Sequence, residues 1–368
     1  MIKITTQSPR MKIVGALIIL SATLLSPQIS KVENNETLRI EIGRSLYFDK
    51  ALSNPDGQAC SVCHAPKTSF SDPDHAIVSE GIIDGAFVSR NSQSLAYVKY
   101  VPPLTIDASG IYHGGLFWDG RVNTLEEQLA GPLFNTAEMN NPDTMTVSDA
   151  IRKAEYYKDF LSLYGNGDDR HIYMSACNAI AAFERSEYLN EFSSKFDSYL
   201  LGKIELHEHE KRGLDLFQGK AGCVKCHTMT PAPDGKILFT DYSYHNLGVP
   251  KNNNNPFYTT SPHLNDKGST FIDLGLGNTA HAAEQNGKFR VPTLRNVQYT
   301  GPYFHNGYFR TLHEVVHFLN TRDHGNFDTP EVTSNIAHQF TGSLQLSDEE
   351  EDAIVAFLLT LSDGFSEE

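Results

Sequence analysis

Two short stretches of this sequence combine cysteine and histidine at a spacing that suits covalent attachment of haem. Residues 60–64 read CSVCH and residues 223–227 read CVKCH, so each is a C-x-x-C-H motif. Two thiols three positions apart can add to the two vinyl groups of one porphyrin, and the histidine that follows can bind the iron. We therefore expect two covalently bound haem c groups. The attachment and axial residues would be Cys60, Cys63, His64, Cys223, Cys226 and His227.

Other uses of paired cysteines fit these motifs less well. Two C-x-x-C pairs could build one zinc site, but the pairs lie far apart in the chain and a histidine directly follows each. A thioredoxin-like redox motif requires a βαβ setting, which the surrounding sequence does not show. The fifth cysteine, Cys177, lies in a stretch typical of a buried helix, so we expect it to be a small core residue.

The composition excludes several classes of function. The chain has 368 residues, of which 40% are hydrophobic and 20% charged, so whole-chain disorder is excluded and about two domains are expected. It carries 30 basic and 45 acidic side chains, with a net charge of −15. Such a chain would not neutralise phosphates, and nucleic-acid binding is not expected.

The beginning of the chain has the layout of a secretory signal. Arg10 and Lys12 precede an apolar run over residues 13–25, and a serine- and proline-containing end follows. The run is shorter than the roughly 20 residues that a transmembrane helix needs. We predict a signal peptide over residues 1–30, a periplasmic protein, and no stable membrane insertion after cleavage. An uncleaved anchor is the alternative.

The elements around the two motifs repeat. Gly43 leads an amphipathic stretch before the first motif, and Gly213 leads a similar stretch before the second. Residues 117–127 match residues 304–314 without a gap. Each half of the chain is therefore interpreted as one haem-binding unit, produced by internal duplication.

Both matching segments end in the start of a helix. Thr124 with Glu127, and Thr311 with Glu314, form the capping-box pattern. Strand signals are weak, and residues 228–288 are polar and turn-rich, which predicts loop. We predict a mainly α fold of two cytochrome c-like haem domains with long loops. The predicted divisions are a signal peptide over 1–30, the N-terminal domain over 31–200 and the C-terminal domain over 201–368.

The repeat also aligns positions that could face the haems. Trp118 takes the position of His305, and Pro132 takes the position of Leu319. Neither proline nor leucine can coordinate iron, so these two positions would leave both haems without an axial ligand from this part of the chain.

With these motifs the chain resembles the bacterial di-haem cytochrome c peroxidases and their MauG-type relatives, over essentially the whole mature sequence. The resemblance implies two c-type haem domains that face each other, with a calcium ion between them. Besides the haem motifs, the segments that carry it are Arg90-Asn91, 117–121 (FWDGR), Gly131-Pro132, Glu138-Met139, 292–296 (PTLRN) and 300–305 (TGPYFH).

The resemblance implies roles for individual residues. It makes His64 and His227 the proximal iron ligands. It places Trp118 between the haems as the electron conduit and Glu138 over the first haem as acid/base. Pro132, in the matching Gly131-Pro132 segment, is the third candidate catalytic residue.

The calcium site follows from the same resemblance. Its ligands would be the side chain of Asn91 and the backbone carbonyls of Thr300 and Pro302. Oxygen ligands of this kind suit a hard cation.

The sequence departs from the family at three positions. Ordinary peroxidases place a blocking histidine where Ile83 stands, so we expect the first haem to be open in all redox states. Methionine or tyrosine normally stands at the position of Leu319, next to the second haem. His324 is the preferred substitute ligand over His317, and a five-coordinate second haem is the other possibility. The third position is Ala221, where MauG has a tryptophan that passes oxidising equivalents to its protein substrate. That relay is therefore absent here as such.

These features predict a periplasmic di-haem c-type peroxidase. Hydrogen peroxide would bind the open N-terminal haem. There Glu138 would move a proton from one peroxide oxygen to the other, which would raise the rate by about 10²–10⁴. Electrons would pass from the C-terminal haem, supplied by a small periplasmic cytochrome c or copper protein. One alternative is a MauG-like enzyme that oxidises tryptophan or tyrosine side chains of a partner protein. Another is a non-enzymatic electron carrier or sensor.

Overall fold

The computed structural model describes residues 22–366. The signal peptide expected over residues 1–30 falls mostly outside this range and stays a prediction. Within residues 22–366, no helix is both long enough and apolar enough to cross a membrane.

The fold is mainly α, as predicted. Strands are limited to two small antiparallel pairs, in which Thr105 pairs with His113 and Tyr244 pairs with Arg290. The α-helices are α1 (Ala22–Phe48), α2 (Cys60–Cys63), α3 (Leu125–Gln128), α4 (Ala130–Phe134), α5 (Thr144–Lys153), α6 (Tyr157–Tyr164), α7 (Asp169–Arg185), α8 (Lys195–Leu200), α9 (Glu208–Gln218), α10 (Leu276–Ala280), α11 (Leu312–Thr321) and α12 (Asp348–Leu359). The strands are β1 (Thr105–Ile106), β2 (Tyr112–His113), β3 (Tyr244–His245) and β4 (Phe289–Arg290).

Short 3₁₀ helices interrupt the long connections. The region 228–288, predicted as loop, contains only short elements of this kind besides β3 and α10. The 3₁₀ helices are η1 (Lys50–Leu52), η2 (Pro66–Thr68), η3 (Val98–Tyr100), η4 (Glu187–Leu189), η5 (Cys223–Lys225), η6 (Pro256–Thr259), η7 (Gly268–Thr270), η8 (Ala283–Gln285) and η9 (Val297–Tyr299).

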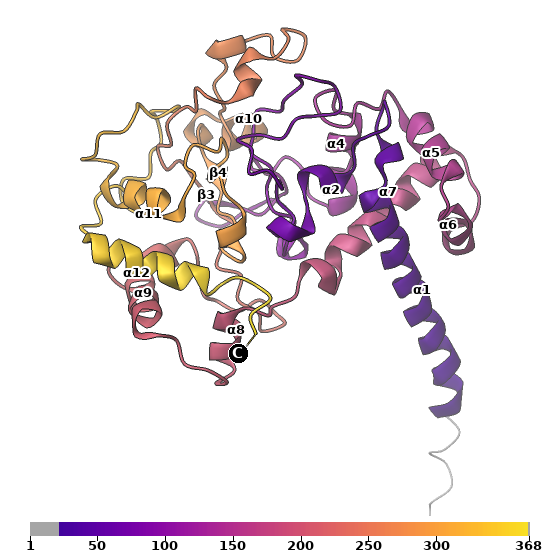
Figure 1. Ribbon diagram of the computed structural model, residues 1–368, viewed down its shortest axis with the longest axis horizontal. Helices are drawn as coiled ribbons and strands as arrows, with labels where there is room; N and C mark the ends of the chain where they lie inside the picture. Colours follow the sequence, from indigo (N-terminus) through magenta and orange to yellow (C-terminus); the bar gives the residue numbers. More distant parts are fainter. Residues whose placement is uncertain (1–21, 367–368) are drawn as a thin grey trace, which may run out of the picture.

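The helices gather on two sides of the molecule. Figure 1 shows α1, α5, α6 and α7 on one side and α9, α11 and α12 on the other, with loops and the small strands between them. The two largest hydrophobic clusters follow this division. One draws its buried side chains from residues 42–192 together with Leu238, and the other from residues 196–361.

Each side is built on a pair of helices whose backbones touch. Helix α1 packs on α7, and α9 packs on α12. A Cβ atom on Gly43 would lie 1.9 Å from the carbonyl oxygen of Ala179, and one on Gly213 would lie 1.9 Å from that of Ala353. Only glycine permits this approach, which explains why glycine begins both repeated stretches.

The two predicted helix starts differ in detail. At Thr311 the capping box is complete, because the threonine accepts from Glu314 N and the Glu314 carboxylate accepts from Thr311 N. At Thr124 only the first of these hydrogen bonds forms, from Glu127 N. The prediction of a capping box is therefore correct for α11 and only half correct for α3.

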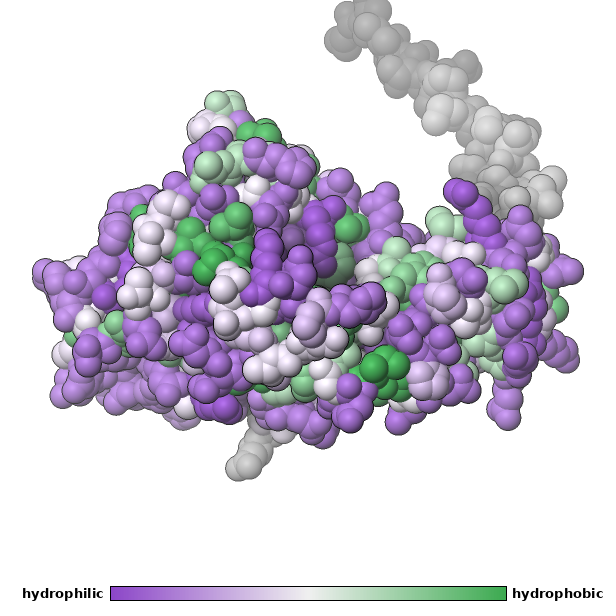
Figure 2. All heavy atoms as spheres, turned by 90° about the horizontal axis from the view of Figure 1, so that it is seen from above, coloured by the Kyte–Doolittle hydropathy of each residue, from purple (hydrophilic) through white to green (hydrophobic). Residues whose placement is uncertain are grey.

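The surface is predominantly hydrophilic on the face seen from above. Figure 2 shows hydrophobic residues there as separate small patches among hydrophilic ones.

Candidate functional site

Each of the two C-x-x-C-H motifs forms a short helical turn. The first motif forms α2, and its His64 N donates to Cys60 O at 2.9 Å. The second forms η5, and His227 N donates to Cys223 O at the same distance. A shared local geometry thus places two thiols and an imidazole together twice.

Both histidines are held in the state that a metal ligand requires. The pKa values of His64 and His227 are lowered by burial, so both imidazoles are neutral. Nδ1 of His64 lies 3.2 Å from Phe70 O, and Nδ1 of His227 lies 2.9 Å from Phe239 O. With Nδ1 donating to the carbonyl, Nε2 keeps a free lone pair for iron.

The cysteines do not assemble into a zinc site. Burial raises the pKa of Cys60 and of Cys223 to about 12, so these thiols stay protonated. No group of three or more metal-ligating Cys, His, Asp or Glu side chains occurs in the described part of the chain. Separate attachment of two porphyrins therefore fits the geometry better than one shared metal ion.

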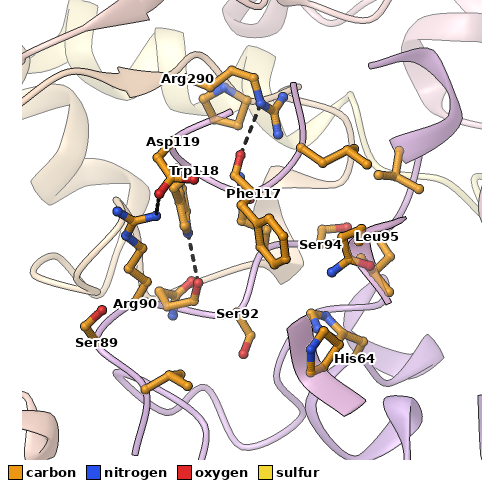
Figure 3. Close-up of a pocket in the computed structure, with 18 of the residues that line it drawn as sticks. His64, Ser89, Arg90, Ser92, Ser94, Leu95, Phe117, Trp118, Asp119 and Arg290 are labelled. Atoms are coloured by element: carbon orange, nitrogen blue, oxygen red, sulfur yellow. Dashed lines mark hydrogen bonds and ion pairs between the residues drawn. The ribbon is translucent and has the colours of Figure 1, made fainter. Parts of the chain in front are cut away.

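Each motif borders a cavity. The first cavity, which His64 borders (Figure 3), has a volume of about 570 Å³. Pro132 and Glu138 also line it. The second, about 220 Å³, is lined by Cys223, Cys226 and His227 together with Leu319. The aligned positions 132 and 319 thus each face one of the two cavities.

Trp118 lines both cavities. Its indole Nε1 donates to Asn91 O at 2.9 Å (Figure 3). Its backbone carbonyl accepts from Arg290 N at 3.0 Å. One contact therefore orients the ring and the other holds the backbone of Trp118 at the boundary, where the ring could transfer electrons between the cavities.

Glu138 provides the titratable group of the first cavity. Burial raises the pKa of its carboxyl group, opposed by a hydrogen bond from Asn135 Nδ2 to Oε2 at 2.7 Å. Among the described residues Oε1 accepts no hydrogen bond, so one carboxyl oxygen is positioned and the other is available to a bound molecule. A carboxyl group whose pKa is raised in this way can both accept and donate a proton during the reaction.

Arg290 is a buried cation that forms no ion pair with any residue that the structure describes. Its side chain lines both cavities and the residue is 7% exposed. Among residues 22–366, the guanidinium makes a single hydrogen bond, from Nε to Phe117 O at 3.4 Å (Figure 3). By contrast, Arg90 forms ion pairs with Asp119 at 2.7 Å and Asp273 at 2.6 Å. Burying an unpaired charge costs several kcal/mol. The propionate groups of haem would supply the missing anion, so this residue fits the two cofactors that the motifs predict.

The three residues expected to bind calcium all line the first cavity. Asn91 donates through Nδ2 to Ala76 O and Ile77 O, at 3.3 and 3.1 Å, which leaves its Oδ1 free to act as a ligand. Thr300 and Pro302 line the same cavity from the other half of the chain.

His324 is not brought to the second cavity. It follows the end of α11, is exposed, and its Nε2 pairs with Ser343 Oγ at 3.0 Å. The prediction that His324 ligates the second iron is therefore not supported, because the turn after the helix directs the ring to the surface. Ile83 is 41% exposed and is not part of the first cavity's lining.

Sequence reasoning missed several residues of these cavities. Asn135, which positions Glu138, and Arg290 were not singled out as site residues. His245 also lines the second cavity, with its Nε2 3.0 Å from Ser243 Oγ. The sequence contained one signal for Arg290: residues 290–294 (RVPTL) weakly resemble residues 90–95 (RNSQSL), and each segment begins with an arginine.

Known proteins share this sequence and architecture. The family model for di-haem cytochrome c peroxidase matches residues 37–205. The methylamine utilization protein MauG of Paracoccus denitrificans is 33% identical over 346 residues, 88% of each chain. A cytochrome-c peroxidase of a Pseudomonas species is 31% identical over 338 residues, covering 88% of this chain and 80% of the relative. The crystal structure of the di-haem peroxidase BthA from Burkholderia thailandensis superposes with a TM-score of 0.78 at 31% identity, covering 89% and 86% of the two chains.

Proposed function

The chain belongs to the superfamily of di-haem cytochrome c peroxidases and MauG proteins, and from this membership we propose that it reduces hydrogen peroxide in the first cavity with electrons delivered through Trp118. The observation that carries the proposal is the convergence of His64, Glu138 and Trp118 on one cavity, with Trp118 also bordering the second. We place the enzyme in the periplasm, on the predicted signal peptide.

Each residue of the first cavity has a separate role in the proposed reaction. His64 would hold the haem iron, and the bound haem would supply the redox chemistry for cleavage of the O–O bond. Glu138 takes a proton from one peroxide oxygen and returns it to the other, so that water leaves instead of hydroxide. Asn135 keeps the carboxyl group oriented for both transfers. Arg290, which lines both cavities, would neutralise propionate charge of the cofactors.

Two kinds of protein partner could supply the electrons. In the first proposal the donor is a small periplasmic cytochrome c or copper protein. In the second, a tryptophan or tyrosine side chain of a partner protein is oxidised, as in a MauG-like enzyme. Ile83 favours the second proposal, because it stands where a gated peroxidase has its blocking histidine and does not line the first cavity. Ala221 weakens the MauG route, because the relay tryptophan of MauG is missing there.

The residues support two further parts of the proposal. Calcium would bind Asn91 Oδ1 and the carbonyl groups of Thr300 and Pro302, coupling the two halves beside the first cavity. The halves, residues 31–200 and 201–368, would be duplicated cytochrome c-like units, since their glycine contacts and haem-motif geometry recur. Chelation should slow the peroxide reaction, and added calcium should restore it.

A stoichiometric peroxide titration tests the function. All-ferric protein is mixed with one equivalent of hydrogen peroxide without donor, and visible and near-infrared spectra are followed. We expect rapid oxidation of the protein by two equivalents, then discharge by a reduced small cytochrome c. A state that ignores the cytochrome would favour the protein side-chain substrate. Absence of reaction in the ferric form would contradict the proposal.

A further inference from the structure

A line of aromatic rings leads away from the first cavity. Tyr97 lines the cavity and is 1% exposed. Its ring centroid lies 4.6 Å from that of Phe192, which in turn lies 5.6 Å from that of Tyr100, edge to face. Tyr100 is only partly buried. The three rings therefore connect the cavity with the surface through direct contacts.

Both tyrosines in this line donate their phenol hydrogen to a carboxylate. Tyr97 Oη donates to Asp363 Oδ2 at 2.5 Å, and Tyr100 Oη donates to Asp234 Oδ2 at 2.6 Å. Asp234 is exposed. A phenol that loses an electron becomes strongly acidic, and a carboxylate at hydrogen-bond distance can take the proton at once. Both tyrosines thus combine ring contact with a proton acceptor.

We propose that Tyr97, Phe192 and Tyr100 form an aromatic port, through which the first cavity takes electrons from a tyrosine or tryptophan side chain of a protein docked at Tyr100. The inference rests on the proposed peroxide reaction, which supplies the oxidising equivalents, in the version in which a protein side chain, and not a donor acting through Trp118, returns the electrons. Phe192 bridges the tyrosines by contact and is not itself oxidised.

The electron and proton balance closes for each transfer. Tyr100 gives one electron toward the cavity through Phe192 and Tyr97, and gives its phenol proton to Asp234. It then takes one electron from the partner side chain and recovers its proton from Asp234, while the partner releases one proton to solvent. Two such transfers supply two electrons, and the solvent supplies two protons. Together they convert one hydrogen peroxide into two waters.

A second tyrosine pair provides a matched control. Tyr156 Oη donates to Asp49 Oδ2 at 2.6 Å, the same chemistry as the Tyr100 pair. Tyr156 packs on the first hydrophobic cluster but lines neither cavity. A general effect of losing a phenol would therefore appear in Tyr156→Phe as well as in Tyr100→Phe.

The test uses the holoprotein with one equivalent of hydrogen peroxide and a nitroso spin trap. Electron paramagnetic resonance detects tyrosyl radicals, peptide mass spectrometry locates the trapped adduct, and haem spectra give the lifetime of the oxidised state. We expect an adduct on Tyr100 in the wild type. Tyr97→Phe and Tyr100→Phe should lengthen the lifetime by about tenfold, a small change in barrier, and remove this adduct. Asp234→Asn, which keeps the ring, should also slow the decay, whereas Tyr156→Phe should match the wild type.

The outcomes separate the port from the proposed function. Rapid reaction with peroxide, combined with unchanged decay in Tyr97→Phe and Tyr100→Phe, would overturn the port alone. An adduct found only elsewhere would do the same. Wild-type protein that does not react with peroxide would overturn the proposed function and, with it, the port.

Discussion

Glu138 shows how one carboxyl group is adapted to its cavity. Burial holds its pKa above the ordinary value, while Asn135 partly opposes that shift. If the ionised form accepts the first proton, the peroxide reaction should slow as the pH falls through this raised pKa, at higher pH than for an ordinary carboxyl group. Glu138→Gln should lower the rate by about 10²–10⁴ and abolish this acid limb. Stopped-flow spectra over a pH series measure both effects.

The control for this prediction is Glu127→Gln, which changes an exposed glutamate near the same cavity. It should leave the rate and the pH profile unchanged. An acid limb that persists in Glu138→Gln would show that another group sets it.

Glu184 is a second buried carboxyl group. Its pKa affects the free energy of unfolding, whereas that of Glu138 affects the peroxide reaction. It is 1% exposed, its Oε2 has no hydrogen-bond partner within residues 22–366, and burial raises its pKa from 4.5 to about 8. The folded protein therefore holds a proton that the unfolded chain has lost. The stability this contributes is complete below pH 4.5 and is lost as the pH rises to about 8.

Glu184→Gln should remove this pH dependence. Between pH 5 and pH 9 the wild type should lose up to a few kcal/mol more unfolding free energy than the variant, since each pKa unit corresponds to about 1.4 kcal/mol. Urea unfolding of the holoprotein at several pH values tests this, with exposed Glu187→Gln as control. Parallel pH profiles for the wild type and Glu184→Gln would refute it.

Single residues were predictable where their chemistry is local in sequence. The haem-binding cysteines and histidines lie within five consecutive residues, so spacing alone indicated their role. His324 was chosen by elimination, and no local pattern could reveal that its ring pairs with Ser343, 19 residues away. The cavity positions of Glu138 and Trp118 came from the family resemblance, since neither has a distinctive spacing.

At the scale of elements, the helix pairs depend on glycine contacts. In α9, a methyl group on Gly213 would overlap Ala353 O, so Gly213→Ala must separate α9 from α12. We expect a loss of about 1–3 kcal/mol or more in unfolding free energy, typical of overpacking. Denaturant unfolding measures it. Lys211→Ala, at an exposed position of the same helix, should change stability by less than about 0.5 kcal/mol. Equal stability in both variants would mean that the helices are free to separate without cost.

Elements were predictable in type more than in detail. The capping residues at Thr311 and Thr124 correctly marked two helix starts, because this signal is local. The long region 228–288 was correctly expected to be loop-rich. Its role in shaping the second cavity was not predictable, because His245 and Asn246 reach that cavity only through tertiary packing.

At the scale of the whole molecule, Arg290 links the two cavities electrostatically. Removing its charge should make reduction harder at both haems. Arg290→Gln should lower both midpoint potentials by on the order of tens of millivolts, the effect of one charge at about 8–10 Å in a medium of dielectric constant about 20. Spectroelectrochemical titration measures them, with haem content as a check on folding. Exposed Arg310→Gln is the control, and unchanged potentials in Arg290→Gln would show that the guanidinium does not pair with the propionates.

The sequence could not predict which side chains meet at the boundary between the two cavities. Arg290 and Phe117 are 173 residues apart, and Arg90 and Asp273 are 183 residues apart. Such contacts arise only when both halves have folded against each other. The duplicated pattern suggested two similar units, but it contained no information on which side chains would occupy the boundary.

The hydrogen bond of Trp118 distinguishes it from the tyrosines of the aromatic port. The indole N–H points at a backbone carbonyl, which cannot accept a proton, whereas Tyr97 and Tyr100 each face a carboxylate that can. When Trp118 loses an electron, its N–H proton would therefore stay in place and the indole would carry a positive charge. A nearby donor would then reduce this radical cation to neutral indole. Charge would pass through Trp118 without pausing and without responding to pH. At the tyrosines the oxidising equivalent could persist as a neutral radical. Trp118 would therefore only transfer charge, whereas Tyr97 and Tyr100 could also hold it.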